Sequence, residues 1–157
     1  MPVNPIPEGF RTVTPSLTIK DAAKAIEFYK KAFGATELMC MKTPDGRVGH
    51  CELKIGDSVI FVNDEFPEMG KTRSPQTLGM STGGLCLYVE DVDTSYARAI
   101  EAGGTTEMTV ANMFWGDRFG TLIDPFGHIW SIATRKEDLT TEQMAERAKA
   151  FYAKAAA

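Results

Sequence analysis

The chain has 157 residues, of which 43% are hydrophobic and 24% are charged, and its formal net charge is −4. This length and balance are typical of a single folded domain that buries its own core without disulfides, and they argue against a disordered or fibrous chain. Lys and Arg are scattered along the sequence, which argues against the concentrated basic face that nucleic acids require. We therefore expect a small neutral or charged molecule as the partner.

The N-terminal segment and the cysteines indicate the compartment. The stretch "MPVNPIPEGF" holds three prolines and no basic residue followed by an apolar run, so we expect neither a signal peptide nor a membrane anchor. Cys40, Cys51 and Cys86 are odd in number and far apart, and each lies in an apolar, strand-like run without metal-binding spacing. The sequence predicts reduced core cysteines in a cytoplasmic protein with no membrane partner.

The first half of the chain has the pattern of a strand, a helix and three more strands, over residues of about 10–64. The alternating stretch "RTVTPSLTI" predicts the first strand. The helix that follows is expected to begin at Asp21 and to end at Gly34. Its residues Ile26, Tyr29 and Phe33 lie on one face. The three later strands, joined by tight turns, are "ATELMCMK", "RVGHCELKI" and "SVIFVND".

The same βαβββ pattern returns in the second half, at about 82–135. A polar linker at about 65–81, punctuated by Pro and Gly, separates the two copies, and its residues Phe66, Pro67 and Met69 could form a lid. The repeat begins with the strand "GGLCLYV" and the helix "EDVDTSYARAIEAGG" and continues with the strands "TTEMTVA", "RFGTLI" and "HIWSIAT". Residues 1–157 are thus expected to form one domain built by internal duplication.

A C-terminal helix is expected at about 140–155. Thr140 and Gln143 have the spacing of a capping box. One apolar stripe is formed by Met144, Ala148, Phe151 and Tyr152. This stripe can pack on the body of its own subunit, which we favour, or it can serve as an arm that swaps between subunits of a dimer.

The tandem pattern, with "TIKDAAKAIEFYKKAFGA" at the first strand-to-helix step and "DPFGHIWSIAT" at the last hairpin, resembles the glyoxalase/bleomycin-resistance/extradiol-dioxygenase superfamily, also called vicinal oxygen chelate. The stretches "PDGRVGHCELKIGDS", "VEDVD", "FWGDRFG" and "IATRKEDLT" look like its PhnB-type branch. The resemblance implies an α+β fold whose two modules form an open, cup-shaped, eight-stranded mixed sheet. It also implies helices on the convex face, a ligand on the concave face and a homodimer.

For the metalloenzymes of this superfamily, the resemblance implies a divalent ion held by His, Glu or Gln from the first and fourth strands of each module. The matching positions in this chain lie near Thr14, Phe61, Gly84 and Ser131. None of these residues offers the imidazole or carboxylate donors that transition metals need. We therefore expect no cofactor at that site, although a divalent metal elsewhere stays open. An extradiol dioxygenase is disfavoured because the chain has two His in all.

Alternation in "RVGHCELKI" points to another possible site. One face carries Gly49, Cys51, Leu53 and Ile55, the side expected beneath the helix. The opposite face carries Val48, His50, Glu52 and Lys54. If that face is concave, His50 and Glu52 can act as an acid and a base or as part of an unusual metal site. The alternative is an exposed sheet face on which Glu52 and Lys54 pair with neighbours.

Aromatic residues supply the remaining candidates for ligand binding. In "NMFWGDRFG", Phe114 and Trp115 either plug the cup or stack on a flat ligand, with Arg118 placed for a carboxylate or phosphate. The alternative is that Trp115 packs under its loop and Asp117 fixes the turn. Phe61 of the fourth strand and Trp130 of the last strand complete the ligand-binding set.

The stretch "DPFGHIW" predicts a hairpin that places His128 near Trp130. Pro125 suits the second position of a β-turn and Gly127 its close, so His128 opens the last strand. Because the superfamily's ligands occupy the face of Ser131, His128 points away from it or lies at the rim. We expect a structural rather than a catalytic role for His128.

Two functions remain for the chain. The first is a metal-free protein that sequesters a small organic molecule or binds a metabolite in the concave cavity. The alternative is a glyoxalase-like lyase or isomerase that uses His50 and Glu52, so whether the protein is an enzyme stays open. A methyltransferase is disfavoured because no Gly-rich loop joins a strand to a helix.

Overall fold

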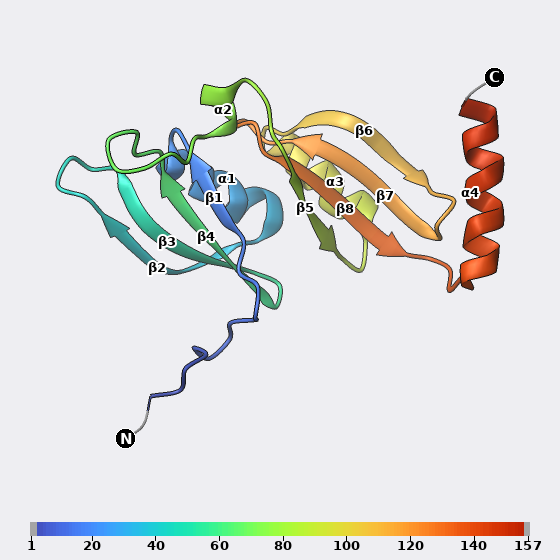
Figure 1. Cartoon of the computed structure of the whole chain (residues 1–157), viewed down its shortest axis with the longest axis horizontal. Coiled ribbons are helices and arrows are strands. Elements are labelled where there is room, and N and C mark those ends of the chain that lie inside the picture. Colours follow the sequence, from blue (N-terminus) through green and yellow to red (C-terminus); the bar gives the residue numbers. More distant parts are fainter. Residues whose placement is uncertain (1–2, 156–157) are drawn as a thin grey trace.

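The computed structural model describes residues 3–155 and contains two βαβββ modules followed by a helix (Figure 1). The first module consists of β1 (Ser16–Ile19), α1 (Ala22–Phe33), β2 (Thr36–Lys42), β3 (Val48–Ile55) and β4 (Ser58–Asp64). The second module consists of β5 (Gly84–Tyr88), α3 (Val92–Glu101), β6 (Thr105–Asn112), β7 (Asp117–Ile123) and β8 (Ile129–Arg135). The short helix α2 (Pro75–Leu78) lies between the modules, and α4 (Thr141–Ala155) follows them. The predicted α+β fold is confirmed.

The eight strands are divided between two open four-stranded sheets. Their orders are β1-β4-β3-β2 and β5-β8-β7-β6, and in each sheet the first pair is parallel while the others are antiparallel. Both sheets are therefore mixed, as predicted. Within residues 3–155 no hydrogen-bonded ladder joins the edge strands β1 and β5, so the expected eight-stranded sheet exists as two separate halves.

The helices cover one face of each sheet and leave the other face open. Helix α1 begins at Asp21, whose carboxylate accepts a hydrogen bond from the backbone N–H of Lys24 at 3.4 Å, and ends at Gly34 with φ 66°. The stripe predicted for α1 is buried: Ile26, Tyr29 and Phe33 are at most 7% exposed. Helices α1 and α3 also pack against each other, behind the two sheets in Figure 1. The open faces thus lie on the side opposite to both helices.

A buried carboxylate joins the two modules. Asp124 Oδ2 accepts hydrogen bonds from the Tyr29 hydroxyl at 2.7 Å and from Trp130 Nε1 at 2.9 Å. Asp124 Oδ1 accepts the backbone N–H groups of Phe126 and His128, each at 2.9 Å. Because Tyr29 belongs to α1 and the other groups to the second module, this carboxylate ties one module to the other.

His128 has the structural position that the sequence predicts. Its side chain is 9% exposed, and its Nε2 lies 3.2 Å from the backbone carbonyl of Thr18 in β1. The preceding turn closes with a hydrogen bond from the Gly127 N–H to the Asp124 carbonyl at 3.1 Å, and Gly127 has a φ of 90° that favours glycine. His128 therefore makes a second bridge between the modules.

The Tyr29 phenol predicts a loss of stability in alkali. Burial raises the pKa of Tyr29 well above its usual value, and the Asp124 carboxylate raises it further. The contribution of Tyr29 to stability is intact below its unfolded pKa of about 10 and is lost as the pH rises above it, because only the unfolded state then releases the proton. Urea unfolding measures this loss. Above pH ~10, the free energy of unfolding of the wild type is expected to fall by up to about 1.4 kcal/mol per pH unit more than that of Tyr29→Phe. Equal slopes for the two proteins would contradict this assignment.

The predicted alternation in β3 breaks at Val48. Val48 was expected on the open face, but it is 0% exposed and belongs to the core. The pairing of β2 with β3 explains the difference, since Met41 pairs with His50 and Lys42 with Val48, which leaves Gly49 as an extra residue. This bulge turns Val48 toward the helix and exposes Gly49. The alternation holds from His50 onward.

The prediction that all three cysteines are core residues was wrong for Cys86. Cys51 is fully buried and Cys40 is partly buried, but Cys86 is exposed. In β5, Leu85 and Leu87 pack against the core, so alternation directs Cys86 to the open face of the second sheet. All three thiols are free.

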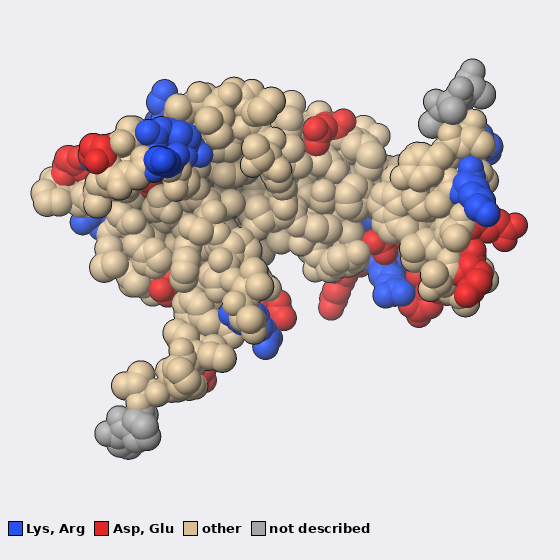
Figure 2. Space-filling view, in the orientation of Figure 1, with Lys and Arg blue, Asp and Glu red and all other residues tan. Residues whose placement is uncertain are grey.

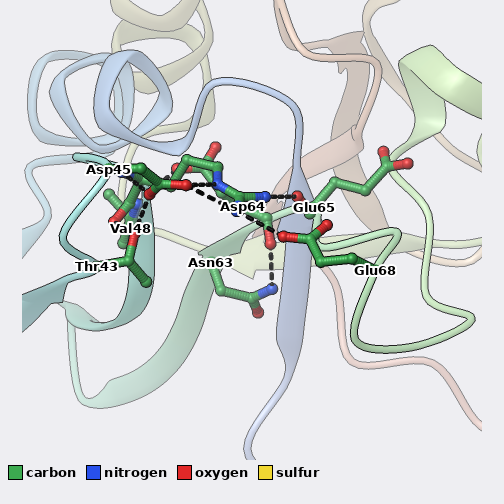
Figure 3. A network of polar contacts seen from close by, with 8 residues as sticks. Thr43, Asp45, Val48, Asn63, Asp64, Glu65 and Glu68 are labelled. Carbon is green, nitrogen blue, oxygen red and sulfur yellow. Dashed lines mark hydrogen bonds and ion pairs between the residues drawn. The ribbon is translucent and has the colours of Figure 1, made fainter.

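The linker between the modules is anchored at both ends. Its start is held by Arg47, which pairs with Asp45 at 2.8 Å and with Glu68. Asp45 and Glu68 are both labelled in Figure 3. The Arg47 guanidinium also lies 4.2 Å from the ring centroid of Phe66. Its end reaches the second module through Gln76 Nε2 and the Pro125 carbonyl, 3.3 Å apart. The linker borders a cavity of about 450 Å³ between β1 and β5 that His50 does not line.

Helix α4 stands at the outer edge of the second module (Figure 1). Its capping box is confirmed. The backbone N–H of Thr140 donates to Gln143 Oε1 at 2.9 Å, and the backbone N–H of Gln143 donates to Thr140 Oγ1 at 3.2 Å. Phe151 and Tyr152 contact Phe114 but stay 45% and 63% exposed. Within one chain, the stripe thus contacts the second module at Phe114, as favoured from the sequence, while much of its apolar surface stays exposed. None of the helices described here is long and apolar enough to cross a membrane.

Candidate ligand-binding face

The open face of the first sheet brings together three of the predicted site residues. In the register of the strands, Phe61 of β4 pairs with Glu52 of β3, and His50 lies two residues before Glu52. The intervening Cys51, and Leu53 beyond, are fully buried beneath the helix. His50, Glu52 and Phe61 therefore share the face that no helix covers.

These side chains contact one another. His50 Nε2 lies 3.4 Å from Glu52 Oε1, and the His50 ring meets the Phe61 ring with centroids 4.7 Å apart and planes 64° apart. The side chains of His50 and Glu52 are 31% and 20% exposed, so both are partly shielded and still accessible. The N-terminal arm adds Phe10, whose ring centroid is 5.9 Å from that of Phe61.

A cavity of about 440 Å³ lies between this face and the N-terminal arm. Its walls include Pro5, Pro7, Phe10, Thr12, Glu52 and Phe61. Arg11 and Thr14 also line the cavity, so the walls combine flat apolar surfaces with one carboxylate, one guanidinium and two hydroxyls, a composition common to pockets for small organic molecules. Sequence reasoning missed the contribution of the arm because its prolines indicate only an extended segment.

The candidates from "NMFWGDRFG" lie in the second module, away from His50. Trp115 Nε1 and the Tyr88 hydroxyl both donate to Oδ2 of Asp117, at 3.1 and 2.8 Å. This hydrogen bond to Asp117 raises the pKa of Tyr88 above its usual value. Arg118 forms two 2.7 Å bonds with the carboxylate of Asp93, which raise the pKa of its guanidinium. The Arg118 guanidinium, which was expected to bind a carboxylate or phosphate of the ligand, is thus already paired with Asp93.

The two remaining candidates are engaged in packing. Phe114 contacts Phe151 of α4 with ring centroids 5.1 Å apart. Trp130 is 0% exposed and packs against Phe33 and Tyr29, with ring centroids 4.5 and 5.2 Å apart. The seven predicted site residues therefore lie in three places: one cluster on the first sheet, one at the outer end of the second sheet, and Trp130 in the core.

A larger cavity of about 650 Å³ separates the two modules. Its apolar walls include Phe33, Val59, Leu85, Leu87, Trp130 and Ile132. Arg11, Asp57 and Arg98 also border it. Sequence reasoning did not find this cavity, because it depends on how the two modules sit against each other, which no local pattern encodes.

The positions that correspond to the superfamily's metal ligands do not fit a divalent ion. The sequence indicated positions near Thr14, Phe61, Gly84 and Ser131, but Thr14 precedes β1 and Gly84 pairs with Ile129. On the open faces, Ser16 instead lies opposite Phe61 and Cys86 lies opposite Ser131. Of these four side chains only the thiol is a strong ligand for a transition metal, whereas catalytic sites use three protein ligands such as imidazole, carboxylate or thiolate. Across residues 3–155, no three His, Cys, Asp or Glu side chains are grouped so that they could hold a metal ion.

The chain consists of two βαβββ modules, and the open sheet of each module is covered by a helix on one face only. This arrangement defines a paired-module α+β protein. The model of the Glyoxalase/Bleomycin resistance protein/Dioxygenase superfamily matches residues 11–132, and the chain belongs to this superfamily. The resemblance inferred from the sequence is thereby confirmed.

Similar proteins agree with this assignment. An uncharacterised protein of Mycobacterium bovis is 39% identical over 134 residues, which cover 84% of this chain and 88% of that protein. TioX from Micromonospora sp. ML1 has a TM-score of 0.65 at 21% identity and covers 80% of this chain and 98% of its own. The PhnB protein from Bacillus cereus, a putative 3-demethylubiquinone-9 3-methyltransferase, has a TM-score of 0.61 at 18% identity, covering 79% and 99%. At these identities the two solved structures establish the fold alone.

Proposed function

We propose that this protein binds a small organic molecule on the open face of the first sheet and acts in sequestration or metabolite binding. The observation that carries the proposal is that Glu52 and Phe61 line a 440 Å³ cavity and that His50 contacts both of them. Three side chains that were selected from the sequence for their chemistry meet there, partly buried and within contact of one another. The proposal needs no metal, in keeping with the donor set at the superfamily's metal positions.

The lining indicates the chemistry of the ligand. Phe10 and Phe61 offer apolar rings for a flat or amphipathic molecule, and the His50 ring already meets Phe61 at a steep angle. Glu52 supplies an acceptor at the wall of the cavity. A planar ring that bears an amine or a hydroxyl group satisfies both surfaces, because its donor can reach the carboxylate while the ring packs against the aromatic side chains.

Phe61→Ala tests this site. A panel of metabolites and drugs is screened by thermal shift, and the affinity of each hit is measured by calorimetry. Phe61→Ala is expected to weaken binding about tenfold or more, since loss of one aromatic contact is worth ~1.4 kcal/mol. Phe151→Ala, which removes a half-exposed ring from α4, serves as the control and should bind like the wild type. Unchanged affinity in Phe61→Ala would remove this face from the binding site.

The contact between His50 and Glu52 supports a second candidate, a glyoxalase-like lyase or isomerase. A carboxylate that accepts the Nε2 proton would orient the ring and leave Nδ1 as the base that moves a substrate proton. For such an enzyme, His50→Gln and Glu52→Gln should each abolish turnover of a bound compound while changing its affinity only a few-fold. Turnover that persists in both variants would reject this candidate.

We further infer a homodimer located in the cytoplasm. Large apolar side chains are exposed on the first sheet, including Leu38, Met39 and Met41, and Tyr88 is 68% exposed on the second. Figure 2 shows a broad uncharged area over the middle of the molecule, with charged side chains gathered at its edges and on α4. Such a surface favours burial against a second copy. Light scattering after gel filtration is expected to give twice the mass of one chain, and the monomer mass would contradict the inference.

A further inference from the structure

Two of the three cysteines lie directly opposite each other on neighbouring strands. In the antiparallel pairing of β2 with β3, Cys40 pairs with Cys51. Both belong to the helix-covered side of the sheet, where Cys40 packs against the core that contains Cys51. Directly opposed residues have Cβ atoms about 4.5–5.5 Å apart, whereas a disulfide requires about 3.5–4.5 Å. A small approach of the two strands therefore brings the sulfurs within bonding distance.

The surroundings of the pair permit that approach. Strand β2 is an edge strand, and its pairing with β3 is irregular on both sides of residues 39–41. An edge strand with two irregularities can shift by a fraction of an ångström without breaking the core, because nothing in its own sheet packs on its outer side.

The two thiols differ in their access to solvent. Cys51 is 0% exposed, and Cys40 is partly exposed. Burial raises the pKa of the Cys51 thiol, and the neighbouring Cys40 thiol raises it further. Cys51 therefore stays protonated and shielded, and an oxidant from solvent meets the sulfur of Cys40 first.

We propose that Cys40 and Cys51 form an oxidisable dithiol that closes to an intrachain disulfide between β2 and β3. Hydrogen peroxide is the oxidant class: its O–O bond breaks as the Cys40 sulfur becomes a sulfenic acid, and one water leaves. The Cys51 sulfur then attacks the Cys40 sulfur, and its proton departs with the hydroxyl as a second water. The two sulfurs lose two electrons in all, and these reduce the peroxide.

The disulfide would fix the edge strand beside the proposed ligand-binding face. Cys51 lies between His50 and Glu52, and Cys40 lies between Met39 and Met41, which point to the open face. The bond would therefore join the backbones of the two strands that carry these side chains. This inference depends only on the pairing of β2 with β3, so it stands whether or not that face binds a ligand.

Peptide mapping after oxidation tests the proposal. The full chain is treated with hydrogen peroxide, free thiols are alkylated, and the protein is digested with trypsin. Cleavage after Lys42 and Arg47 separates the two cysteines, so their peptides stay together only when a disulfide joins them. The wild type and Cys86→Ser should both yield the linked peptides, with an intact mass lower by two hydrogen atoms, and a dithiol reductant should restore the original mass.

The variants define the outcomes. Cys40→Ser should yield no linked peptides while keeping the circular dichroism spectrum of the wild type. The proposal is overturned if peroxide modifies only the exposed Cys86 in the wild type. It is equally overturned if Cys51 becomes linked to Cys86 as readily as to Cys40.

Discussion

Asp124→Ala is expected to lower the free energy of unfolding by about 3–5 kcal/mol, because it removes a buried acceptor from four donors. The side chain is 3% exposed, so the donors cannot turn to water. Its loss leaves the Tyr29 hydroxyl and Trp130 Nε1 buried without their partner, each at a cost of about 1–3 kcal/mol. It also releases the N–H groups that shape the turn before β8.

Urea denaturation followed by circular dichroism measures this change. Asp138→Ala is the matched control, because the Asp138 side chain is 93% exposed and pairs only with Arg135 three residues away. The control should shift the free energy by less than ~0.5 kcal/mol. A loss below ~1 kcal/mol in Asp124→Ala would show that the two modules do not depend on this carboxylate.

Trp130→Ala is expected to cost about 3–5 kcal/mol, as do other truncations of large buried aromatic side chains. The indole is fully buried against α1 and also borders the 650 Å³ cavity, so truncation would enlarge a space that is already present. The surrounding residues cannot refill that volume without moving one module against the other. Most of the cavity penalty should therefore persist.

The other tryptophan provides the comparison. Trp115 is only partly buried and lies in the turn between β6 and β7 at the outer end of the second sheet, so Trp115→Ala should cost clearly less. Equal losses in the two variants would contradict the placement of Trp130 in the core. Combining Asp124→Ala with Trp130→Ala should cost less than the sum of the single changes, because the two side chains share one hydrogen bond.

The elements of this fold can be predicted from the sequence because their signals are local. Asp21 and Gly34 mark the ends of α1 within a few residues of the helix they bound, and alternation in β3 gives the correct face to His50 and Glu52. The same βαβββ order recurs in the second half of the chain, so the fold prediction rests on two copies of one pattern. These features need no knowledge of distant contacts.

The features that could not be predicted depend on distant partners or on a single inserted residue. Tyr29 and Asp124 meet across 95 positions, and Arg118 finds Asp93 across 25, so neither pair leaves a local pattern. Val48 changed face because Gly49 forms a bulge, which simple alternation does not anticipate. Trp130 and Arg118 were proposed from their chemistry, and their tertiary contacts already engage both side chains.

Chemical-shift mapping tests the central claim most directly. The protein is labelled with ¹⁵N and ¹³C and titrated with the tightest compound from the screen. Binding at the proposed site should give the largest shifts at His50, Glu52 and Phe61, with smaller ones extending to Phe10. Shifts confined to Leu85, Leu87 and Trp130 around the cavity between the modules would contradict it.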